Sequence, residues 1–394
     1  MWSFTRRHSV INVFQPSLGE EEAAAVAEVF ATNWTGRGPR TKAFEAEFAE
    51  HIGARPEQVL FINSCTSGLF LAVDLLELGP DDEVVLPSVS FVAAANAVAA
   101  AGARPVFCDS DVRTLNPTAD HIERALTERT KAVVVLHYGG YPGHIAEIAR
   151  LCRRRGITLV EDAACSVSST ADGQACGTFG DISTWSFDSM KVLVTGDGGA
   201  FYARDPEVAH RARQLAYHGL EHASAFDAAK VSDRWWEPNV QGFGRRSIGN
   251  DVTAAIGSVQ LRKLPDFVAR RRAIAALYDR LLADAEGVRL PPPLPEGHTS
   301  SHYFYWVQLD AAVRGQVARD LLERGIFTTF RYPALHKVPA YRSEGTSLPG
   351  AEEAADRTLL LPLHQGLSDS EVHTVVDELR KSVERRSQAL RIGG

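Results

Sequence analysis

Lys191 is the side chain whose surroundings call for a chemical explanation. The stretch "SFDSMKVLVTGDGGAF" (residues 186–201) places it directly before the apolar run Val192–Val194 and just ahead of a glycine cluster. A lysine between apolar segments either extends its ammonium group out of the fold or is kept for the reactivity of its amine. The chain uses far more arginine than lysine. We therefore treat Lys191 as a candidate nucleophile.

Three further stretches suit the same kind of chemistry. "INSCTSGL" (62–69) follows a predicted strand and opens a helix, so its backbone N–H groups could bind a phosphate, although an ordinary helix cap explains the same letters. "LVEDAACS" (159–166) puts Asp162 at the end of a predicted strand, where a buried carboxylate needs a cationic partner unless it only caps a helix or forms a structural ion pair. Phe91 opens the predicted helix that follows "LPSVS" (86–90) and, taken singly, would be a core residue.

These four features together match pyridoxal 5′-phosphate (PLP). The cofactor has an aldehyde that condenses with lysine, a pyridinium nitrogen that pairs with a carboxylate, a ring face that stacks and a phosphate that must be anchored. No other single interpretation uses the lysine, the phosphate site, the carboxylate and the aromatic ring at once. The sequence therefore predicts a PLP site.

Alternating strands and helices between residues 55 and 205 would position these side chains. The predicted strands cover 57–63, 82–87, 103–109, 131–138, 157–164, 181–187 and 198–204. This alternation predicts an α/β fold with a mostly parallel seven-stranded sheet and helices on both faces. The loops after parallel strands meet at the carboxyl edge of the sheet, where such folds bind ligands.

The pattern changes after residue 250. Residues 251–284 carry apolar side chains at helical spacing, and Pro265 is expected to break this helix. An extended linker (291–297) then leads to a small α+β unit, predicted as a strand at 303–310, a helix at 314–325, a segment at 327–333 and a final helix from Ser368. We expect a large cofactor-binding domain over 1–250 and a linking helix with a small C-terminal domain over 251–394.

Composition excludes several classes of function. The 394 residues carry a net charge of −7, so no overall field attracts nucleic acid or an anionic membrane. No apolar run is long enough to span a bilayer, and "MWSFTRRHSV" lacks the apolar core of a signal peptide. The five cysteines form no CxxC pair, which favours free thiols over disulfides or a metal site. We expect a cytoplasmic protein without a metal.

The chain resembles the DegT/StrS family of fold-type I, PLP-dependent nucleotide-sugar aminotransferases over nearly its whole length. "EDAA" (161–164) followed by "FGDISTWSFDSMKVLVTGDGG" (179–199) is similar to the family's Asp…Ser-Phe-x-x-x-Lys…Gly-Asp/Glu-Gly-Gly signature. Further similar segments occur in the family's order at 36–49, 87–109, 254–264 and 361–369.

The resemblance implies a role for each matching residue. Lys191 would bind PLP covalently and later move a proton between the substrate carbon and the cofactor, while Asp162 would keep the pyridine nitrogen protonated. The cofactor's phosphate and ring would be contacted by Ser186, the backbone of Cys65, the hydroxyl of Thr66 and the ring of Phe91.

Two departures from the family pattern affect the expected site. Cys165 stands where the family commonly has Gln or His near the cofactor, and Ser166 is an alternative source of that contact. The family's Gly-Tyr-Asn-x-Arg reads Gly-Phe-Gly-Arg-Arg at 242–246. Arg246 then matches the arginine, and Asn250 is the candidate for an asparagine that reaches the partner's cofactor.

Substrate contacts are expected from a second group of residues. Arg245, Arg246 and Arg331 could bind the sugar diphosphate or the donor's carboxylates, since a guanidinium suits both. Tyr332 and His336 resemble a family loop near the sugar. Surface or core positions are the alternative for each of these five residues.

The resemblance implies transfer of an amino group from L-glutamate to a nucleoside-diphosphate keto sugar, with pyridoxamine 5′-phosphate (PMP) as the intermediate form of the cofactor. A homodimer with composite active sites is implied as well. The sequence of residues 186–199 favours a dTDP-4-keto-6-deoxyhexose as the substrate and a 4-amino sugar as the product. The frequent use of arginine and alanine fits a bacterium with a GC-rich genome that makes antibiotics. The alternatives are a 3-keto-sugar or aminocyclitol aminotransferase and, from another class, a non-catalytic PLP-binding regulatory protein. Lys191 argues against the dehydratase branch, which has histidine there.

Overall fold

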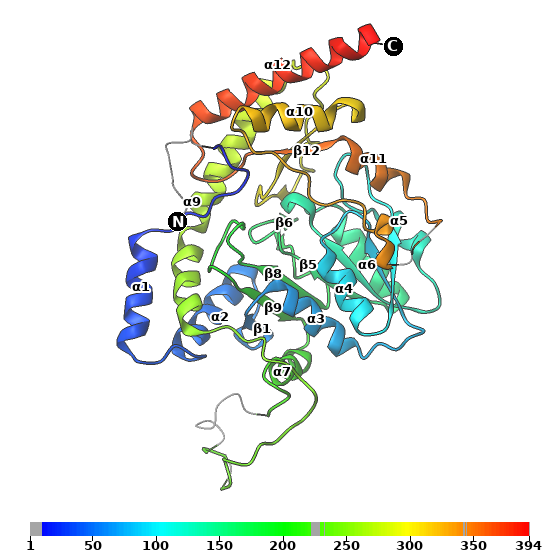
Figure 1. Ribbon diagram of the computed structural model, residues 1–394. Coiled ribbons are helices and arrows are strands. Elements are labelled where there is room, and N and C mark those ends of the chain that lie inside the picture. The colour runs from blue at the N-terminus through cyan, green and yellow to red at the C-terminus, as the bar shows by residue number, and fades with distance from the viewer. Residues whose placement is uncertain (1–9, 222–228, 232, 342, 344, 394) are drawn as a thin grey trace.

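A seven-stranded sheet lies at the centre of the computed structural model, which describes residues 10–221, 229–231, 233–341, 343 and 345–393 (Figure 1). The order along the sheet is β1-β9-β8-β5-β4-β2-β3. The strands are β1 (Val59–Ile62), β2 (Glu83–Pro87), β3 (Arg104–Cys108), β4 (Thr130–Leu136), β5 (Thr158–Asp162), β8 (Ile182–Ser186) and β9 (Gly199–Ala203). β9 runs antiparallel to both of its neighbours, β1 and β8, and every other pair in this sheet is parallel. The predicted α/β fold with a mostly parallel sheet is confirmed.

Helices cover both faces of this sheet. They are α2 (Pro39–Ile52), α3 (Cys65–Leu76), α4 (Val92–Ala100), α5 (Ala119–Ala125), α6 (Ile145–Arg155) and α7 (Pro206–Leu215), whereas α1 (Glu20–Ala31) packs on α9 (Asp251–Leu282). Residues of α3, α4 and α7 pack in one core cluster with Leu60 and Ile62 of β1, whereas α2 packs in another cluster with Phe61. Because β1, β2, β8 and β9 are buried at every residue, their sequences read as continuous runs of buried side chains rather than alternating ones.

Helix α9 (Asp251–Leu282) is continuous, so the predicted break at Pro265 is wrong. A proline inside a helix removes one main-chain hydrogen bond and strains the turn before it. Leu264 and Val268 on either side are buried in the core cluster that holds α2. Tertiary packing therefore keeps the helix intact across the proline.

The C-terminal part is built on two antiparallel strands, β11 (Tyr305–Gln308) and β12 (Thr358–Leu361). Its helices are α10 (Ala311–Glu323), α11 (Pro349–Arg357) and α12 (Asp369–Gly393). Sequence reasoning missed β12, and the segment 327–333 forms only an isolated bridge to it, between Thr329 and Leu360. A three-stranded sheet of β10 (His298–Thr299), β6 (Thr170–Ala171) and β7 (Gln174–Ala175) completes the strands. Within the described ranges, no helix has the length and apolar character needed to cross a membrane.

The segment before α1 contacts the C-terminal part rather than the central sheet. The backbone N–H of Ile11 donates to the carbonyl of Gly325 (2.9 Å), and the N–H of Leu363 donates to the carbonyl of Val13 (3.2 Å). A simple division of the chain at residue 250 does not foresee this contact. It brings the neighbouring Phe14 close to residues from the last third of the sequence.

Candidate active site

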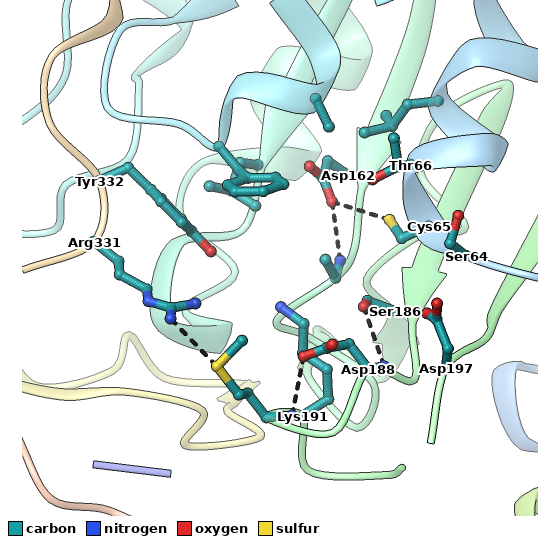
Figure 2. A pocket seen from close by; sticks show the side chains of 16 residues that line it. Ser64, Cys65, Thr66, Asp162, Ser186, Asp188, Lys191, Asp197, Arg331 and Tyr332 are labelled. Atoms are coloured by element: carbon teal, nitrogen blue, oxygen red, sulfur yellow. Dashed lines mark hydrogen bonds between the residues drawn. The ribbon is translucent and has the colours of Figure 1, made fainter. Parts of the chain in front are cut away.

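A cavity of about 370 Å³ lies at the carboxyl edge of the central sheet (Figure 2). Leu136, Asp162 and Ser186 reach it from the last residues of β4, β5 and β8. The predicted site residues that line it are Cys65, Thr66, Phe91, Asp162, Ser186, Lys191, Arg331 and Tyr332. The edge of the sheet therefore gathers most of the residues that sequence reasoning selected.

Asp162 is a buried carboxylate that faces the cavity. Asp162 is only 2% exposed, and its Oδ1 accepts a hydrogen bond from the N–H of Ala164 (3.1 Å). The Cys65 thiol lies 3.8 Å from the same oxygen. Burial raises the pKa of Asp162, while the Ala164 N–H and the charge of Lys191 act in the opposite direction. A cation placed in the cavity would relieve the cost of burying this charge.

Lys191 lies in the loop between β8 and β9, where its backbone N–H donates to the carbonyl of Asp188 (2.8 Å). Its Nζ stands 4.5 Å from the centre of the Tyr303 ring. Burial acts to lower the pKa of Lys191, but the acidic groups around it, with Tyr303 first, outweigh burial and leave the pKa raised. This direction of the shift favours the charged form of the amine.

The N-terminus of α3 forms one wall of the cavity. Ser64 caps the helix by accepting a hydrogen bond from the N–H of Ser67 (3.1 Å). The N–H groups of Cys65 and Thr66 have no acceptor among the described residues. Gly68 lets the helix approach β8, since a Cβ there would stand 2.6 Å from Thr184 Cγ2. Two free N–H groups beside the Ser186 hydroxyl make an anion site.

Aromatic and cationic side chains close the opposite side. The rings of Phe91 and Tyr332 lie 5.4 Å apart between centres, and Phe91 is 43% exposed. Arg331 donates a weak hydrogen bond to the sulfur of Met190 (3.2 Å) and stands 5.1 Å from the centre of the Phe14 ring. No carboxylate of the described residues forms an ion pair with Arg331. The cavity thus holds a guanidinium whose charge the described side chains leave unneutralised.

Two predicted cofactor contacts lie outside this cavity. Cys165 is 2% exposed, and burial raises the pKa of its thiol to about 11. Ser166, the alternative contact, donates its hydroxyl hydrogen to the carbonyl of Ala163 (3.2 Å). Asn250 caps α9, with Oδ1 accepting from the N–H of Thr253 (3.0 Å).

His336 also lies outside the cavity. It is 4% exposed, with Nδ1 2.6 Å from the Ser88 hydroxyl and Nε2 3.0 Å from Glu352. These contacts hold the ring in place, and its expected role near the sugar stays a prediction.

Arg245 and Arg246 line a second cavity of about 290 Å³ that shares Thr66 with the first. Arg245 forms an ion pair with Asp74 (3.0 Å), and Arg246 stands 5.4 Å from the centre of the Tyr217 ring. Both arginines are therefore near the site without facing Lys191.

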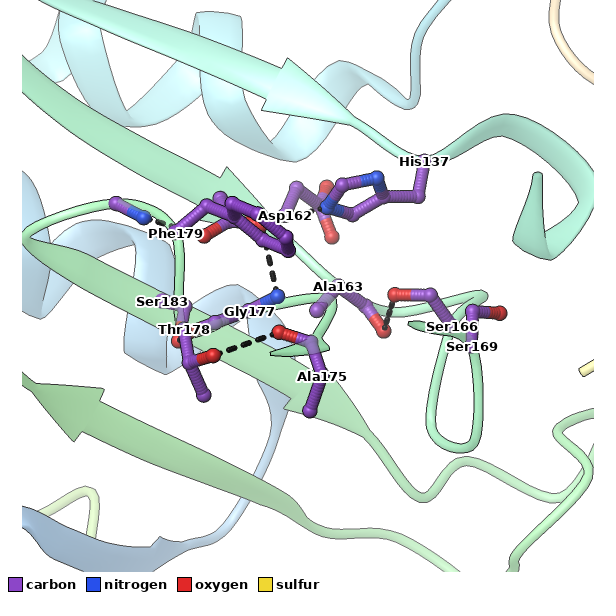
Figure 3. Close-up of polar contacts among 12 residues, drawn as sticks. His137, Asp162, Ala163, Ser166, Ser169, Ala175, Gly177, Thr178, Phe179 and Ser183 are labelled. Atoms are coloured by element: carbon purple, nitrogen blue, oxygen red, sulfur yellow. Dashed lines mark hydrogen bonds and ion pairs between the residues drawn. The ribbon is translucent and has the colours of Figure 1, made fainter. Parts of the chain in front are cut away.

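Sequence reasoning missed several residues of this region. Ser64, Asp188, Met190 and Asp197 line the cavity. Glu161 is fully buried and accepts hydrogen bonds from the N–H groups of Gly177 (2.7 Å) and Gly180 (2.5 Å). Its Oε2 is also 2.8 Å from His137 Nε2. Figure 3 shows His137 and Gly177 in this region, together with Asp162. Alternation along β5 could have indicated Glu161, because a side chain next to Asp162 must face the other side of the sheet.

The residues present fit PLP. The cavity volume suits a small organic ligand. The two free N–H groups of α3 can donate hydrogen bonds to a phosphate, and the buried carboxylate of Asp162 can pair with a pyridinium nitrogen. The amine of Lys191 can condense with an aldehyde. All three reach the same cavity from different elements.

Comparison with known proteins agrees with this chemistry. The model of the DegT/DnrJ/EryC1/StrS aminotransferase family matches residues 16–380. The dTDP-4-dehydro-2,3,6-trideoxy-D-glucose 4-aminotransferase of Saccharopolyspora spinosa is 65% identical over 375 residues, which cover 95% of this chain and 97% of the relative.

Solved structures show the same relationship. The aminotransferase TlmJ from Streptoalloteichus hindustanus is 63% identical, with a TM-score of 0.92 over 96% of this chain and 100% of that one. The sugar aminotransferase Spr1654 from Streptococcus pneumoniae, solved in a PLP form, is 25% identical, with a TM-score of 0.87 over 96% of this chain and 99% of that one. The fold and family expected from the sequence are confirmed: the chain belongs to the DegT/DnrJ/EryC1/StrS aminotransferase family.

Proposed function

We propose that the protein transfers the amino group of L-glutamate to C-4 of a dTDP-linked 4-keto-6-deoxyhexose, with PLP and PMP as alternating forms of its cofactor. The observation that carries the proposal is the 65% identity, over 95% of the chain, to a protein named as a 4-aminotransferase of dTDP-4-dehydro-2,3,6-trideoxy-D-glucose. The product is a 4-amino sugar, made in the cytoplasm.

Each residue of the cavity has a part in this reaction. Bound PLP supplies an aldehyde that takes up the amino group and a ring that withdraws electrons from the adjoining carbon. Asp162 holds a proton on the pyridine nitrogen, because its buried carboxylate favours a cationic neighbour. Lys191 Nζ removes the proton from the amino-bearing carbon of the donor and returns one to the sugar carbon. Thr66, Ser186 and the N–H groups at the start of α3 orient the cofactor through its phosphate.

Arg331 is the residue we assign to the carboxylate of the donor. It lines the cavity with Lys191 and has no carboxylate partner among the described side chains. A guanidinium binds a carboxylate in a bidentate geometry. Arg245 and Arg246, in the adjoining cavity, are the corresponding candidates for the sugar diphosphate.

A homodimer with composite sites is the assembly we propose. Beyond α7 the described residues 229–231 and 233–243 extend away from the body of the molecule (Figure 1). Val231, Trp235, Trp236, Val240 and Phe243 are all exposed there, and Phe243 fully so. An exposed apolar cluster of this kind marks an interaction surface. A second copy of the chain would bury it.

Visible absorption of the PLP-loaded protein tests the proposal, in three steps. L-glutamate alone should convert the spectrum to that of PMP and release 2-oxoglutarate. Addition of dTDP-4-keto-6-deoxyglucose or its 2,3-dideoxy analogue should restore the PLP spectrum and yield the 4-amino sugar, identified by mass spectrometry and NMR. The Lys191→Ala variant, in the same assays, is the control for the amine.

Each other outcome has a distinct meaning. If glutamate converts the spectrum but only a 3-keto sugar or a cyclitol ketone restores it, the sugar assignment is wrong and the donor half stands. If PLP binds and no amino donor changes the spectrum, the protein is a PLP-binding regulator and the proposed reaction is refuted.

A further inference from the structure

Two aromatic rings connect the cation at the base of the cavity with the cation at its mouth. Lys191 Nζ lies 4.5 Å from the centre of the Tyr303 ring. Tyr303 stacks on Phe14 at 5.5 Å between centres, with planes 16° apart. The guanidinium of Arg331 lies 5.1 Å from the centre of the same Phe14 ring. These four side chains come from three distant parts of the sequence, and neither aromatic residue lines the cavity itself.

Both contacts between a cation and a ring are within the range of cation–π interactions, which favour the charged form of the amine or guanidinium. Tyr303 is fully buried, and its hydroxyl has no hydrogen-bond partner of ordinary geometry among the described residues. The ring of Tyr303 makes the cation–π contact with Lys191, and the hydroxyl group also acts on the amine, so the two contributions have to be separated by substitution.

We propose that Tyr303 and Phe14 are positioning residues: the stacked pair holds the free Lys191 ammonium over the Tyr303 ring and holds the Arg331 guanidinium over the Phe14 ring. The amine of Lys191 must leave and rejoin the cofactor in each half of an amino transfer. Once Nζ has taken the donor's proton it is an ammonium group, and a fixed place for that ammonium keeps the proton beside the carbon that receives one next. Only the part of the proposal that concerns Arg331 depends on its assignment as the donor site.

The other groups around Lys191 are the same in every variant of the test. The groups whose charge acts on the amine, apart from Tyr303, include Tyr332, Cys65, Cys165 and Asp162. Tyr303→Leu removes the ring, and Tyr303→Phe removes only the hydroxyl. Tyr305→Leu is the matched control, because Tyr305 lies two residues further along, in a stacked pair with Tyr278 away from Lys191 (4.8 Å between centres, 22°).

Competitive acetylation of the cofactor-free protein measures the pKa of Lys191 directly, through mass spectrometry of the peptide that contains it. A cation–π contact of ordinary strength predicts that Tyr303→Leu lowers this pKa by about 0.5–1.5 units, so the amine reacts roughly 3–30 times faster at a fixed pH below the pKa. Tyr303→Phe should lower it less than Tyr303→Leu does, and Tyr305→Leu should match the wild type.

Two results would overturn the role of the Tyr303 ring. One is an unchanged pKa in Tyr303→Leu; the other is a Tyr303→Phe shift as large as that expected for Tyr303→Leu, which would assign the effect to the hydroxyl. If Tyr303→Leu does not fold, Phe14→Leu decides the question: loss of the stacking ring should lower the pKa of Lys191 in the same direction, and no change refutes the stack.

Steady-state kinetics test whether the Phe14 ring positions the guanidinium of Arg331. Phe14→Leu should raise KM for L-glutamate by about 3–10-fold, because it loosens the guanidinium that binds the donor's carboxylate. An unchanged KM refutes this role. If the wild-type protein does not accept glutamate, the proposed function fails, whereas the acetylation result still decides the role of Tyr303.

Discussion

Glu161 and Asp162 are adjacent in β5, and their carboxylates lie on opposite faces of the central sheet. Asp162 faces the cavity with Lys191, whereas Glu161 accepts hydrogen bonds from the N–H groups of Gly177 and Gly180 and contacts His137. The alternation of a strand produces this separation. Neutralising Asp162 should therefore affect the reaction, whereas neutralising Glu161 should affect the stability of the fold.

Asp162→Asn should keep the fold and bind PLP, yet lower kcat by about 10²–10³-fold, since a charge placed for the reaction is lost. Thermal unfolding of the loaded protein together with kcat gives both readings. A variant with wild-type turnover would show that Asp162 does not hold the pyridine proton.

Glu161→Gln should show the reverse behaviour. Its amide nitrogen cannot accept the hydrogen bonds that Gly177 and Gly180 donate, so we expect the free energy of unfolding to fall by about 3–5 kcal/mol. The molecules that remain folded should turn over normally. Equal loss of activity in both variants would contradict this division of roles.

Lys191→Ala should abolish amino transfer, with a fall of at least ~10²–10⁴-fold, while circular dichroism stays that of the wild type. Lys337→Ala is a suitable control because that lysine is exposed and pairs with Glu352 on the surface. Turnover of glutamate by Lys191→Ala at the control's rate would refute the assignment.

Ser186→Ala and Thr66→Val should weaken PLP binding by about 10–100-fold each, the value of a hydrogen bond to a charged phosphate. Equilibrium dialysis of the cofactor measures this, and kcat at saturating PLP should change little. Free phosphate should compete with PLP for the wild type and compete less well for either variant.

Cys165→Gln, which would restore a residue common in the family, should destabilise the protein by about 1–3 kcal/mol, because the position is closed: Cys165 is 2% exposed, and a Cβ on Gly140 would stand 2.7 Å from its carbonyl oxygen. Cys165→Ser keeps the volume and should behave like the wild type. Denaturant unfolding of the two variants side by side distinguishes crowding from loss of the thiol.

Stability should fall as the pH drops from about 6.5 to about 4. Burial lowers the pKa of His302 and of His364 to about 4, and nearby arginines act in the same direction. In that window the unfolded chain binds protons that the folded one does not, which costs about 1.4 kcal/mol for each pH unit and each histidine.

His364→Asn should flatten this pH dependence. His210→Asn, at an exposed position, should leave it unchanged. A cofactor-free protein equally stable at pH 7 and pH 5 would contradict the expected behaviour of both buried histidines.

Several residues found from the sequence share one property: they end a predicted strand or open a predicted helix. Asp162 ends β5, Ser186 ends β8 and Thr66 opens α3, so local pattern and sheet geometry together place them. Tyr303 and Phe14 have no such signal. Their position depends on how the C-terminal part docks against the sheet and on the N-terminal segment that crosses to it, which no local pattern encodes.

The same limit explains the errors in the secondary structure. The strand β12 lies in a segment whose pairing partner, β11, is distant in sequence, and Pro265 stays helical because α9 is packed against the core. His336 belongs to a loop that the sequence places near the sugar, whereas the structure holds its ring between Ser88 and Glu352, outside the cavity. Local propensity decides these positions less than contacts made elsewhere.

The backbone contacts of Ile11 and Val13 with Gly325 and Leu363 have a consequence for biosynthesis. The segment that holds Ile11 and Val13 is synthesised more than 300 residues before its backbone partners Gly325 and Leu363, and it must wait for them. Arg331 and Tyr332 arrive equally late. A nascent chain that ends before residue 363 can form the central sheet but not the full wall of the cavity, so stable loading of the cofactor should follow the synthesis of residue 363.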